Sequence, residues 1–489
     1  MFSEFEVVIV GGGIAGLTTA RVLLKKQPDL KIVVLEGKER VGGRTLTVDL
    51  PSGNCKTDKF DLGAQWVGRS QHETLELVHE LGLELYDQYD TGKTVAVIGS
   101  TKIRELDEGD YSLIEQADFQ LGIDKLNKLG DGLDIMDPYK WERAEWADGM
   151  SVAQWAKENS LTDSWKDALL TAIRTNFGIE AKRMSLLYSL IYCKSVGVFT
   201  DLIEVSGNGG QAFRIKGGTQ QISEIMAADL GDRVRLGREV QGVETTEERT
   251  TVTLKGGKKL SARRCVLAIP PSQCNRISFS PSLGYHKMMF FQNSVPGHYI
   301  KFVVTFKSAF WREMNRSGAI ISTGKTETPH ELRPIACTYD ATTPGGSAAI
   351  IGFAQNELHD VTLEQRKIVI MKDLERFFGP RVHEELIHYT DKDWSEEPLN
   401  GGCPIDYVTP GNMDSFVALR DPHIGVHFAG CETGVHWMGY MNGAIESGKR
   451  AASEVLLALG HTNKVDVKYL VPPRPRSTVY LEERILSRL

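Results

Sequence analysis

The chain has 489 residues, of which 41% are hydrophobic and 25% charged, and its formal net charge is −7. This length exceeds what one simple core accommodates and predicts two or three domains. The negative charge favours solubility and argues against nucleic acid as a general partner.

The seven cysteines form no C-x-x-C pair, and their odd number favours free thiols in a reducing compartment. The twelve histidines show no spacing such as H-E-x-x-H, so we predict that no metal is bound. The N-terminal residues lack a basic region followed by a cleavable apolar segment, which argues against secretion. No stretch of about 18 apolar residues occurs, so we expect no membrane-spanning helix.

A glycine-rich turn between a strand and a helix is the clearest early signal. An apolar run over residues 5–10 predicts a buried strand, and a helix is expected over residues 17–26. Between them, Gly11 permits a tight turn, Gly13 lets the backbone approach a pyrophosphate, and Gly16 lets helix and strand pack closely. The N-terminus of the helix offers N–H groups and a positive dipole end to that anion.

A second apolar run, over residues 31–35, ends in the acid Glu36. Glu36 follows Gly16 at the spacing of about 20 residues that is typical of a carboxylate bound to ribose hydroxyls. A glycine-rich turn alone would also fit an ordinary strand–helix connection. Because strand, glycines, helix, second strand and acid occur in this order, the sequence predicts a dinucleotide site.

The rest of the chain divides into helical and strand-rich segments. A loop is expected over residues 51–59, then a mainly helical segment over residues 70–209 that we assign to substrate binding. Strands at 213–215, 240–243, 250–254 and 265–269 return the chain to the nucleotide domain, and strands at 299–306, 319–322, 334–340 and 348–353 predict a second sheet. The expected helices are 113–129, 151–158 with Ser151 as N-cap, 164–177, 185–195, 220–229 and 363–378.

Five motifs carry a resemblance to the flavin-containing monoamine oxidases, over residues 5–486. They are E-x-x-x-R-x-G-G-R at 36–44, D-L-G-A-Q-W-V-G at 61–68, N-G-G-C at 400–403, F-A-G-C-E-T at 428–433 and H-W-M-G-Y-M-N-G-A at 436–444. The resemblance implies an α/β fold in which a Rossmann-like FAD-binding domain of the glutathione-reductase type is interleaved with an α+β substrate domain. The expected FAD-binding domain comprises residues 1–84, 213–290 and 396–458, the substrate domain residues 85–212 and 291–395, and the tail residues 459–489.

The resemblance also implies which residues hold the cofactor, FAD. Arg44 would close over the pyrophosphate, Gln65 and Trp66 would lie against the isoalloxazine, and Val240 would contact the adenine side through its backbone. Cys403 resembles the cysteine that carries FAD through a thioether to the 8α-methyl, although a lone cysteine is more often a small buried residue. The implied FAD-binding residues are Gly11, Gly13, Ala15, Gly16, Glu36, Arg44, Gln65, Trp66, Val240, Cys403, Glu432 and Met441.

Three residues are implied in catalysis. Lys301 lies in an apolar strand, where an unpaired lysine is costly, and could face outward on an alternating strand. The resemblance instead places it at the lysine that holds a water near flavin N5. Tyr440 would stand over the re face of the flavin as one wall of an aromatic cage, the alternative being a core tyrosine, and Trp394 matches a tryptophan upstream of the flavin-bearing cysteine.

The implied reaction is FAD-dependent oxidation of a primary amine to an aldehyde, ammonia and H2O2 with O2. Pro404 replaces the second cage tyrosine of the family, and Arg174, Asn176 and Glu204 lie near positions that are apolar in the monoamine enzymes. Two enzymatic alternatives therefore stay open. Glu204 could bind the far ammonium of a diamine or polyamine, and Arg174 could bind the carboxylate of an L-amino acid. A FAD-bearing scaffold without turnover is the non-enzymatic alternative.

The C-terminal segment differs from that of the monoamine oxidases, which continue into a membrane-anchoring helix. Here a proline-rich stretch at 472–475 and a short helix from about Thr478 are expected, followed by Ser487-Arg488-Leu489. This tripeptide resembles the peroxisomal S-K-L address, which would make an import receptor a partner. We expect a peroxisomal or cytoplasmic enzyme rather than one at the mitochondrial outer membrane, and a homodimer stays open.

Overall fold

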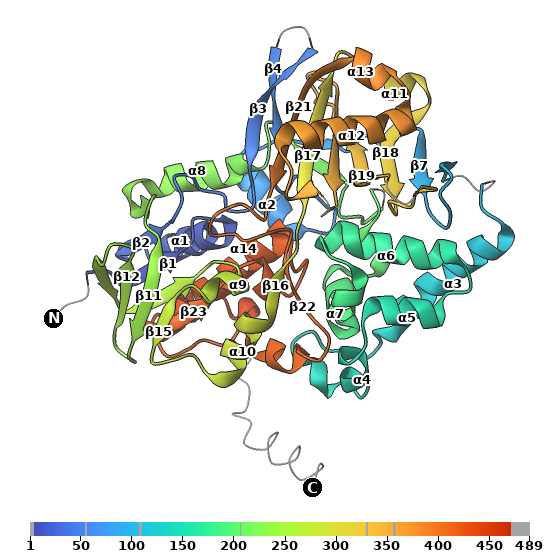
Figure 1. Cartoon of the computed structure of the whole chain (residues 1–489). Coiled ribbons are helices and arrows are strands. Elements are labelled where there is room, and N and C mark those ends of the chain that lie inside the picture. Colours follow the sequence, from blue (N-terminus) through green and yellow to red (C-terminus); the bar gives the residue numbers. More distant parts are fainter. Residues whose placement is uncertain are drawn as a thin grey trace.

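A five-stranded parallel sheet, in the order β10–β2–β1–β14–β23, forms one half of the molecule (Figure 1). The computed structural model describes residues 4–53, 56–106, 110–205, 207–328, 331–355 and 358–470. Strands β1 and β2 are buried along their whole length, as expected for apolar strands covered on both faces. The five strands are β1 (Val7–Val10), β2 (Ile32–Leu35), β10 (Val234–Arg235), β14 (Arg264–Leu267) and β23 (Val426–Phe428).

Alternate residues of β1 enter two different cores, which defines the layers around this sheet. Val7 and Ile9 pack with helices α1 (Ile14–Lys26) and α14 (Met441–Ala458). Val8 and Val10 belong to the core that contains a small sheet in the order β13–β12–β11–β15. The strands of that sheet are β11 (Val240–Thr245), β12 (Thr250–Leu254), β13 (Lys259–Ala262) and β15 (Ser278–Ser280).

A seven-stranded sheet in the order β21–β17–β20–β19–β18–β7–β8 forms the second half, with α12 (Leu363–Phe378) lying across one face (Figure 1). Ile300 and Phe302 share a core with α12, whereas Val303 packs with Phe60 on the other face. Lys301 therefore lies on the face opposite α12. The strands are β7 (Lys93–Val97), β8 (Arg104–Glu105), β17 (Ile300–Phe306), β18 (Arg316–Ser322), β19 (Ile335–Asp340), β20 (Ala349–Ala354) and β21 (Leu386–Asp393).

A group of helices packs beside the seven-stranded sheet and confirms the helical prediction for this part of the chain. Ser151 caps its helix as predicted, because its Oγ accepts a hydrogen bond from Gln154 N at 3.2 Å. The helices are α3 (Leu113–Leu129), α4 (Ala144–Asp148), α5 (Val152–Asn159), α6 (Asp163–Phe177) and α7 (Leu186–Val196).

One expectation from the sequence is wrong, and another is incomplete. The expected loop over residues 51–59 is largely a hairpin, β3 (Thr47–Ser52) with β4 (Lys56–Asp61), whose polar strands are paired in part through Lys59 Nζ and Asp49 Oδ1 at 3.1 Å. The segment over residues 70–209 is mainly helical as expected, but between α2 (His72–Glu80) and α3 it also contains strands: β6 (Leu85–Asp87) pairs with β9 (Phe213–Ile215), and β7 pairs with β18. These strands are short, and their partners lie more than a hundred residues further along the chain.

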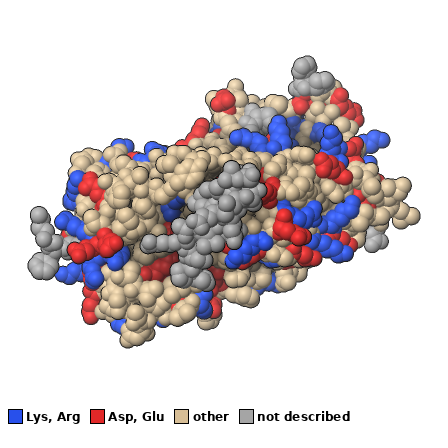
Figure 2. All heavy atoms as spheres, turned by 90° about the horizontal axis from the view of Figure 1, so that it is seen from below, with Lys and Arg blue, Asp and Glu red and all other residues tan. Residues whose placement is uncertain are grey.

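The remaining elements connect these layers. They are β5 (Trp66–Val67), α2 (His72–Glu80), α8 (Gln220–Leu230), α9 (Pro271–Cys274), α10 (Tyr285–Asn293), β16 (Ser294–Pro296), α11 (Phe310–Glu313), α13 (Arg381–Glu384) and β22 (Asp406–Val408). On the face shown in Figure 2, basic and acidic side chains are interspersed.

The predictions for residues 471–489, including the proline-rich stretch and the tripeptide Ser487-Arg488-Leu489, fall outside the described residues and stay predictions. Within the part that is described, no helix combines the length and the apolar character needed to cross a bilayer. The same part of the chain contains no group of three or more His, Cys, Asp and Glu side chains that could hold a metal ion.

Candidate active site

One cavity of about 500 Å³ is bordered by the residues that follow four parallel strands. The carboxyl ends of parallel strands meet at one edge of a sheet, so these segments converge although they are far apart in sequence. The lining segments are Gly11 and Gly13 after β1, residues 36–38 after β2, residues 268–270 after β14 and residues 430–431 after β23.

Two glycine loops and two helix ends border the central part of this cavity. Helix α1 begins after Gly13, and a side chain built on Gly13 would meet only Gly43 Cα, at 4.0 Å. Gly42 N donates to Gly12 O at 2.9 Å, which joins the two loops. Helix α14 begins at Met441, which also lines the cavity. Both N-termini therefore present N–H groups where an anion can bind.

Glu36 and Val240 line the cavity where β2 and β11 approach it. Glu36 is buried, and its two carboxylate oxygens accept hydrogen bonds from Gly12 N at 2.6 Å and from Lys38 N at 2.9 Å. A carboxylate has about four acceptor sites, so lone pairs remain for two hydroxyls. This position fits the ribose-binding role predicted for Glu36.

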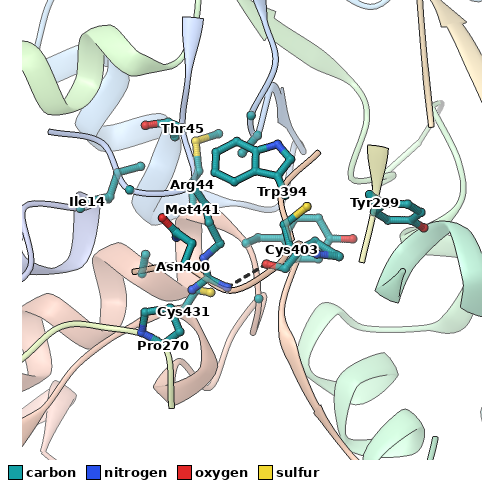
Figure 3. A pocket seen from close by; sticks show the side chains of 18 of the residues that line it. Ile14, Arg44, Thr45, Pro270, Tyr299, Trp394, Asn400, Cys403, Cys431 and Met441 are labelled. Carbon is teal, nitrogen blue, oxygen red and sulfur yellow. Dashed lines mark hydrogen bonds between the residues drawn. The ribbon is translucent and has the colours of Figure 1, made fainter. Parts of the chain in front are cut away.

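Arg44 links the glycine loop to the opposite wall through a buried ion pair. Its Nη1 and Nη2 donate to the two carboxylate oxygens of Glu432 at 2.6 and 3.1 Å, and Nη1 also donates to Pro404 O at 2.8 Å. Figure 3 shows Arg44 among the lining residues. Burial alone would raise the pKa of Glu432, but the charge and hydrogen bonds of Arg44 lower it. Burial and the charge of Glu432 raise the pKa of the neighbouring Asp406 to about 7.

Lys301 points into the cavity, so the alternative of an outward-facing residue is wrong. Its Nζ donates to Gly63 O at 2.6 Å and to Gln65 Oε1 at 2.9 Å, and the residue is 2% exposed. Burial lowers the pKa of Lys301 to about 7, although the charge of Asp61 acts in the opposite direction. The rings of Trp66 and Phe353 each lie 5.5 Å from this nitrogen. Lys301 is thus a weakly basic amine among rings and carbonyls.

Tyr440, Trp394 and Cys403 all line the same cavity. Trp394 Nε1 donates to Leu62 O at 2.9 Å, and this hydrogen bond fixes the indole ring. Figure 3 shows Cys403 close to Trp394, with Tyr299 further to the right. Burial raises the pKa of the Cys403 thiol to about 12, while the charges of Arg44 and Lys301 favour the thiolate.

The ring of Tyr440 is held between two other aromatic rings. Trp437 meets it edge to face at a centroid distance of 4.9 Å, and Tyr192 lies at 6.1 Å. Of these two neighbours, Tyr192 also lines the cavity. This packing fixes the direction in which the Tyr440 ring faces the cavity.

The sequence interpretation missed several aromatic residues of the cavity. They lie outside the recognised motifs, and Phe353 reaches the site because β20 pairs it with Lys301 of β17. Tyr299, two residues before Lys301 in sequence, donates its hydroxyl proton to Arg174 O. The missed residues are Phe119, Tyr192, Tyr299, Tyr339 and Phe353.

Thirteen of the fifteen residues predicted for the site line this cavity, and Gly16 and Glu432 do not. Gly16 supports the turn, since a side chain built there would lie 2.0 Å from Gly11 O. Of the polar residues considered for substrate binding, only Asn176 lines the cavity. Arg174 is paired with Glu180, Nε to Oε1 at 2.8 Å, and Glu204 is exposed.

The comparison with protein families accounts for this arrangement. Residues 14–456 match the sequence model of the family described as flavin containing amine oxidoreductase. The chain belongs to this family. The predictions of an α/β fold with a FAD-binding domain and of an amine oxidase that uses O2 are thereby confirmed.

Individual relatives agree with this membership. Human flavin-containing amine oxidase B is 33% identical over 501 residues, covering 100% of this chain and 94% of the relative. Amine oxidase A of Canis lupus familiaris is 33% identical over 96% of this chain and 88% of its own length. Among solved structures, the cyclohexylamine oxidase of Brevibacterium oxydans IH-35A has a TM-score of 0.85 at 27% identity, covering 93% of this chain and 99% of that one. A wild-type putrescine oxidase bound to putrescine has a TM-score of 0.84 at 26% identity, with the same coverage.

Membership of the family implies FAD as the cofactor, and the residues present fit it. Gly13 and Gly43 leave room for a pyrophosphate between two helix N-termini, and Glu36 offers a carboxylate at the ribose position. Arg44 adds a cation that its bond to Glu432 holds in place. In the family, the oxidation itself depends on FAD, which accepts two electrons from the amine.

Proposed function

We propose that this amine oxidase acts on a primary monoamine with an apolar body. The observation that carries the proposal is the wall of the cavity beyond Lys301. The residues lining this part are aromatic, aliphatic or neutral, and they include Ile98, Phe119, Ala172, Leu202, Ile203 and Ile321. Among the described lining residues, the charged ones other than Lys301 lie in loops of the FAD-binding half of the molecule. They are Glu36, Lys38, Arg44, Arg238, Glu239 and Arg276.

In this proposal the residues around the amine bind, orient and dehydrate it. The face of the Tyr440 ring would hold the neutral nitrogen, and rings such as Tyr339 and Phe353 would exclude water. Lys301 would hold a water through the proton that its two bonds to Gly63 and Gln65 leave free. The oxidised amine is an imine, which water hydrolyses to aldehyde and ammonia.

The rival substrates need charges that the part of the lining beyond Lys301 lacks. A second ammonium is costly to bury without a carboxylate, and the candidate Glu204 is exposed and not part of the lining. An amino-acid carboxylate needs a free cation, but the Arg174 guanidinium is engaged by Glu180 and by Thr323 O. These positions favour the monoamine.

Peroxide formation from four amines tests the proposal. We expect benzylamine to be oxidised with a kcat/KM at least tenfold above that of putrescine, spermine or L-leucine. A preference for any of the other three would refute the monoamine assignment. The scaffold alternative is tested separately, since a non-catalytic protein would keep its flavin absorbance when an amine is added without oxygen.

We further propose that Cys403 holds FAD covalently. Support comes from its place in the cavity, where the charges of Arg44 and Lys301 partly offset the burial that raises the pKa of its thiol to about 12. After acid precipitation, the flavin absorbance should stay with the pellet. In Cys403→Ala it should pass to the supernatant, while the control Cys337→Ala, which alters another thiol of the lining, should behave as the original protein. Flavin in the supernatant of the original protein would show that Cys403 is only structural.

A further inference from the structure

We propose that Thr175 and Asn176 select amines that carry a hydroxyl group at the end away from the nitrogen. This inference rests on the amine oxidase function proposed above and specifies its substrate. It starts from the face that α6 turns towards the cavity. The α6 residues that line the cavity recur at intervals of three and four, which places them on one side of the helix, and they are Ala168, Thr171, Ala172, Thr175 and Asn176.

This helix face opposes the strand side of the cavity. Helix α6 contacts β19, which contributes Cys337 and Tyr339 to the lining. The neighbouring helix α7 contributes Tyr192, whose ring packs on Phe177 of α6 at 4.4 Å and on Tyr440 at 6.1 Å. The C-terminal end of α6 is therefore connected to the site proposed for the amine.

The two polar side chains use their protons within the helix. Asn176 Nδ2 donates to Ala172 O at 2.9 Å, and Thr175 Oγ1 donates to the same oxygen at 3.1 Å. A carbonyl oxygen can only accept, so this bond fixes which side of the amide is the NH2 group. These two bonds leave Asn176 Oδ1 and the lone pairs of Thr175 Oγ1 unused, and both residues line the cavity.

A pair of neutral acceptors in an apolar wall favours a neutral donor. A hydroxyl group gains a hydrogen bond there, whereas an apolar end leaves the acceptors without a partner. An ammonium would have to lose its water without a counter-charge, because Asn176 and Thr175 are uncharged. Sites that bond a substrate hydroxyl discriminate strongly against analogues that lack it.

The test compares tyramine with 2-phenylethylamine, which differ only in the phenol hydroxyl. We expect kcat/KM for tyramine to be about tenfold higher, the effect of about one hydrogen bond. In the double variant Thr175→Val/Asn176→Leu the ratio should fall to within about twofold, while 2-phenylethylamine is still oxidised. Flavin absorbance shows whether the double variant has folded. If the double variant does not fold, the single Thr175→Val variant is measured instead.

A measurement without turnover complements the kinetics. Calorimetry should show tighter binding of 4-ethylphenol than of ethylbenzene to the holoenzyme, and a smaller difference in the variant. Equal kcat/KM values for the two amines, or an unchanged ratio in the variant, would overturn this inference alone. Oxidation of neither amine would overturn the proposed function, and a preference for putrescine would overturn both proposals.

Discussion

Burial lowers the pKa of Lys301 to about 7, and it lowers that of Lys287 to the same value. Lys301 lines the cavity, whereas Lys287 is not part of the lining and donates to Ala418 O at 2.7 Å. The ordinary pKa of a lysine is 10.5, so between about 7 and 10.5 the unfolded chain binds protons that the folded chain does not. The contribution of each lysine to the free energy of unfolding therefore rises with pH across this window and is smallest below it.

The position of Lys301 predicts a pH dependence of the reaction with O2. The protonated ammonium stabilises negative charge that develops on oxygen, so the rate of the reduced enzyme with O2 should fall as pH rises through about 7. In Lys301→Met this rate should be about 100-fold lower at pH 6 and lack the transition. Stopped-flow measurement of flavin reoxidation provides the rate. The transition should persist in Lys287→Met, and its persistence in Lys301→Met would show that another group is responsible.

The Arg44–Glu432 pair predicts a non-additive effect on stability. Glu432→Gln leaves a largely buried guanidinium without its counter-charge and should lower the free energy of unfolding by about 3 kcal/mol. Arg44→Met has the converse defect. Denaturant unfolding of both single variants and the double variant should give a double variant that is more stable than the sum predicts. Additive losses would mean that the pair contributes no coupling.

At the scale of elements, the contact between α1 and α14 brings two helix N-termini to the cavity. A side chain built on Gly448 would lie 2.6 Å from Ala15 O and 2.9 Å from Thr18 Cβ, so this crossing requires glycine. Gly16 has the same function on the other side of α1, against Gly11 O at 2.0 Å. Because glycine has no side chain at these two positions, α1 can pack closely against α14 and against the glycine turn. This close packing sets the spacing of the elements that bind the cofactor.

Substitution of Gly448 by alanine tests this spacing. Gly448→Ala should cost about 1–3 kcal/mol in the free energy of unfolding, because α14 must move away from α1. Flavin content should fall as well, since the displaced helix begins at Met441. Gly130→Ala is the matched control, because nothing lies within 4 Å of a side chain built there and its φ of −82° suits alanine. Equal effects of the two substitutions would contradict the role of the crossing.

The sequence predicted elements whose signals are local. Ser151 directly precedes the helix that it caps, so its role could be predicted from neighbouring residues. The turn could be predicted from the spacing of the glycines from Gly11 to Gly16. The hairpin β3–β4 and strand β7 were missed because short strands depend on their partners more than on their own residues. Lys301 was found only through the resemblance to the family, and Phe353 was missed because it joins the site through the register of β20 with β17.

At the scale of the whole molecule, the cavity joins the two large sheets. Gly11 and Glu36 belong to the edge of the parallel sheet, whereas Lys301 and Phe353 belong to the seven-stranded sheet. Trp66 adds a further link, because its Nε1 donates to Gln88 Oε1 at 2.8 Å and Gln88 Nε2 donates to Asp340 O at 2.7 Å. A ligand that fills the cavity therefore contacts both halves of the molecule.

Hydrogen exchange can measure this coupling. Addition of FAD to flavin-free Cys403→Ala should slow amide exchange both after β2, at residues 36–38, and in β17, at residues 300–303. At 100 times the dissociation constant, FAD should also raise the free energy of unfolding by about 2.7 kcal/mol, visible as a higher Tm. Protection confined to residues 36–38 would show that the two sheets respond independently.

The origin of the cavity walls has a consequence for biosynthesis. Tyr440, Met441 and Ala444 all line the cavity, and α14, which begins at Met441, completes it. A nascent polypeptide that has emerged only as far as Phe428 contains the early glycine turn but lacks this last wall. The complete cavity can therefore form only after residue 444 has been translated.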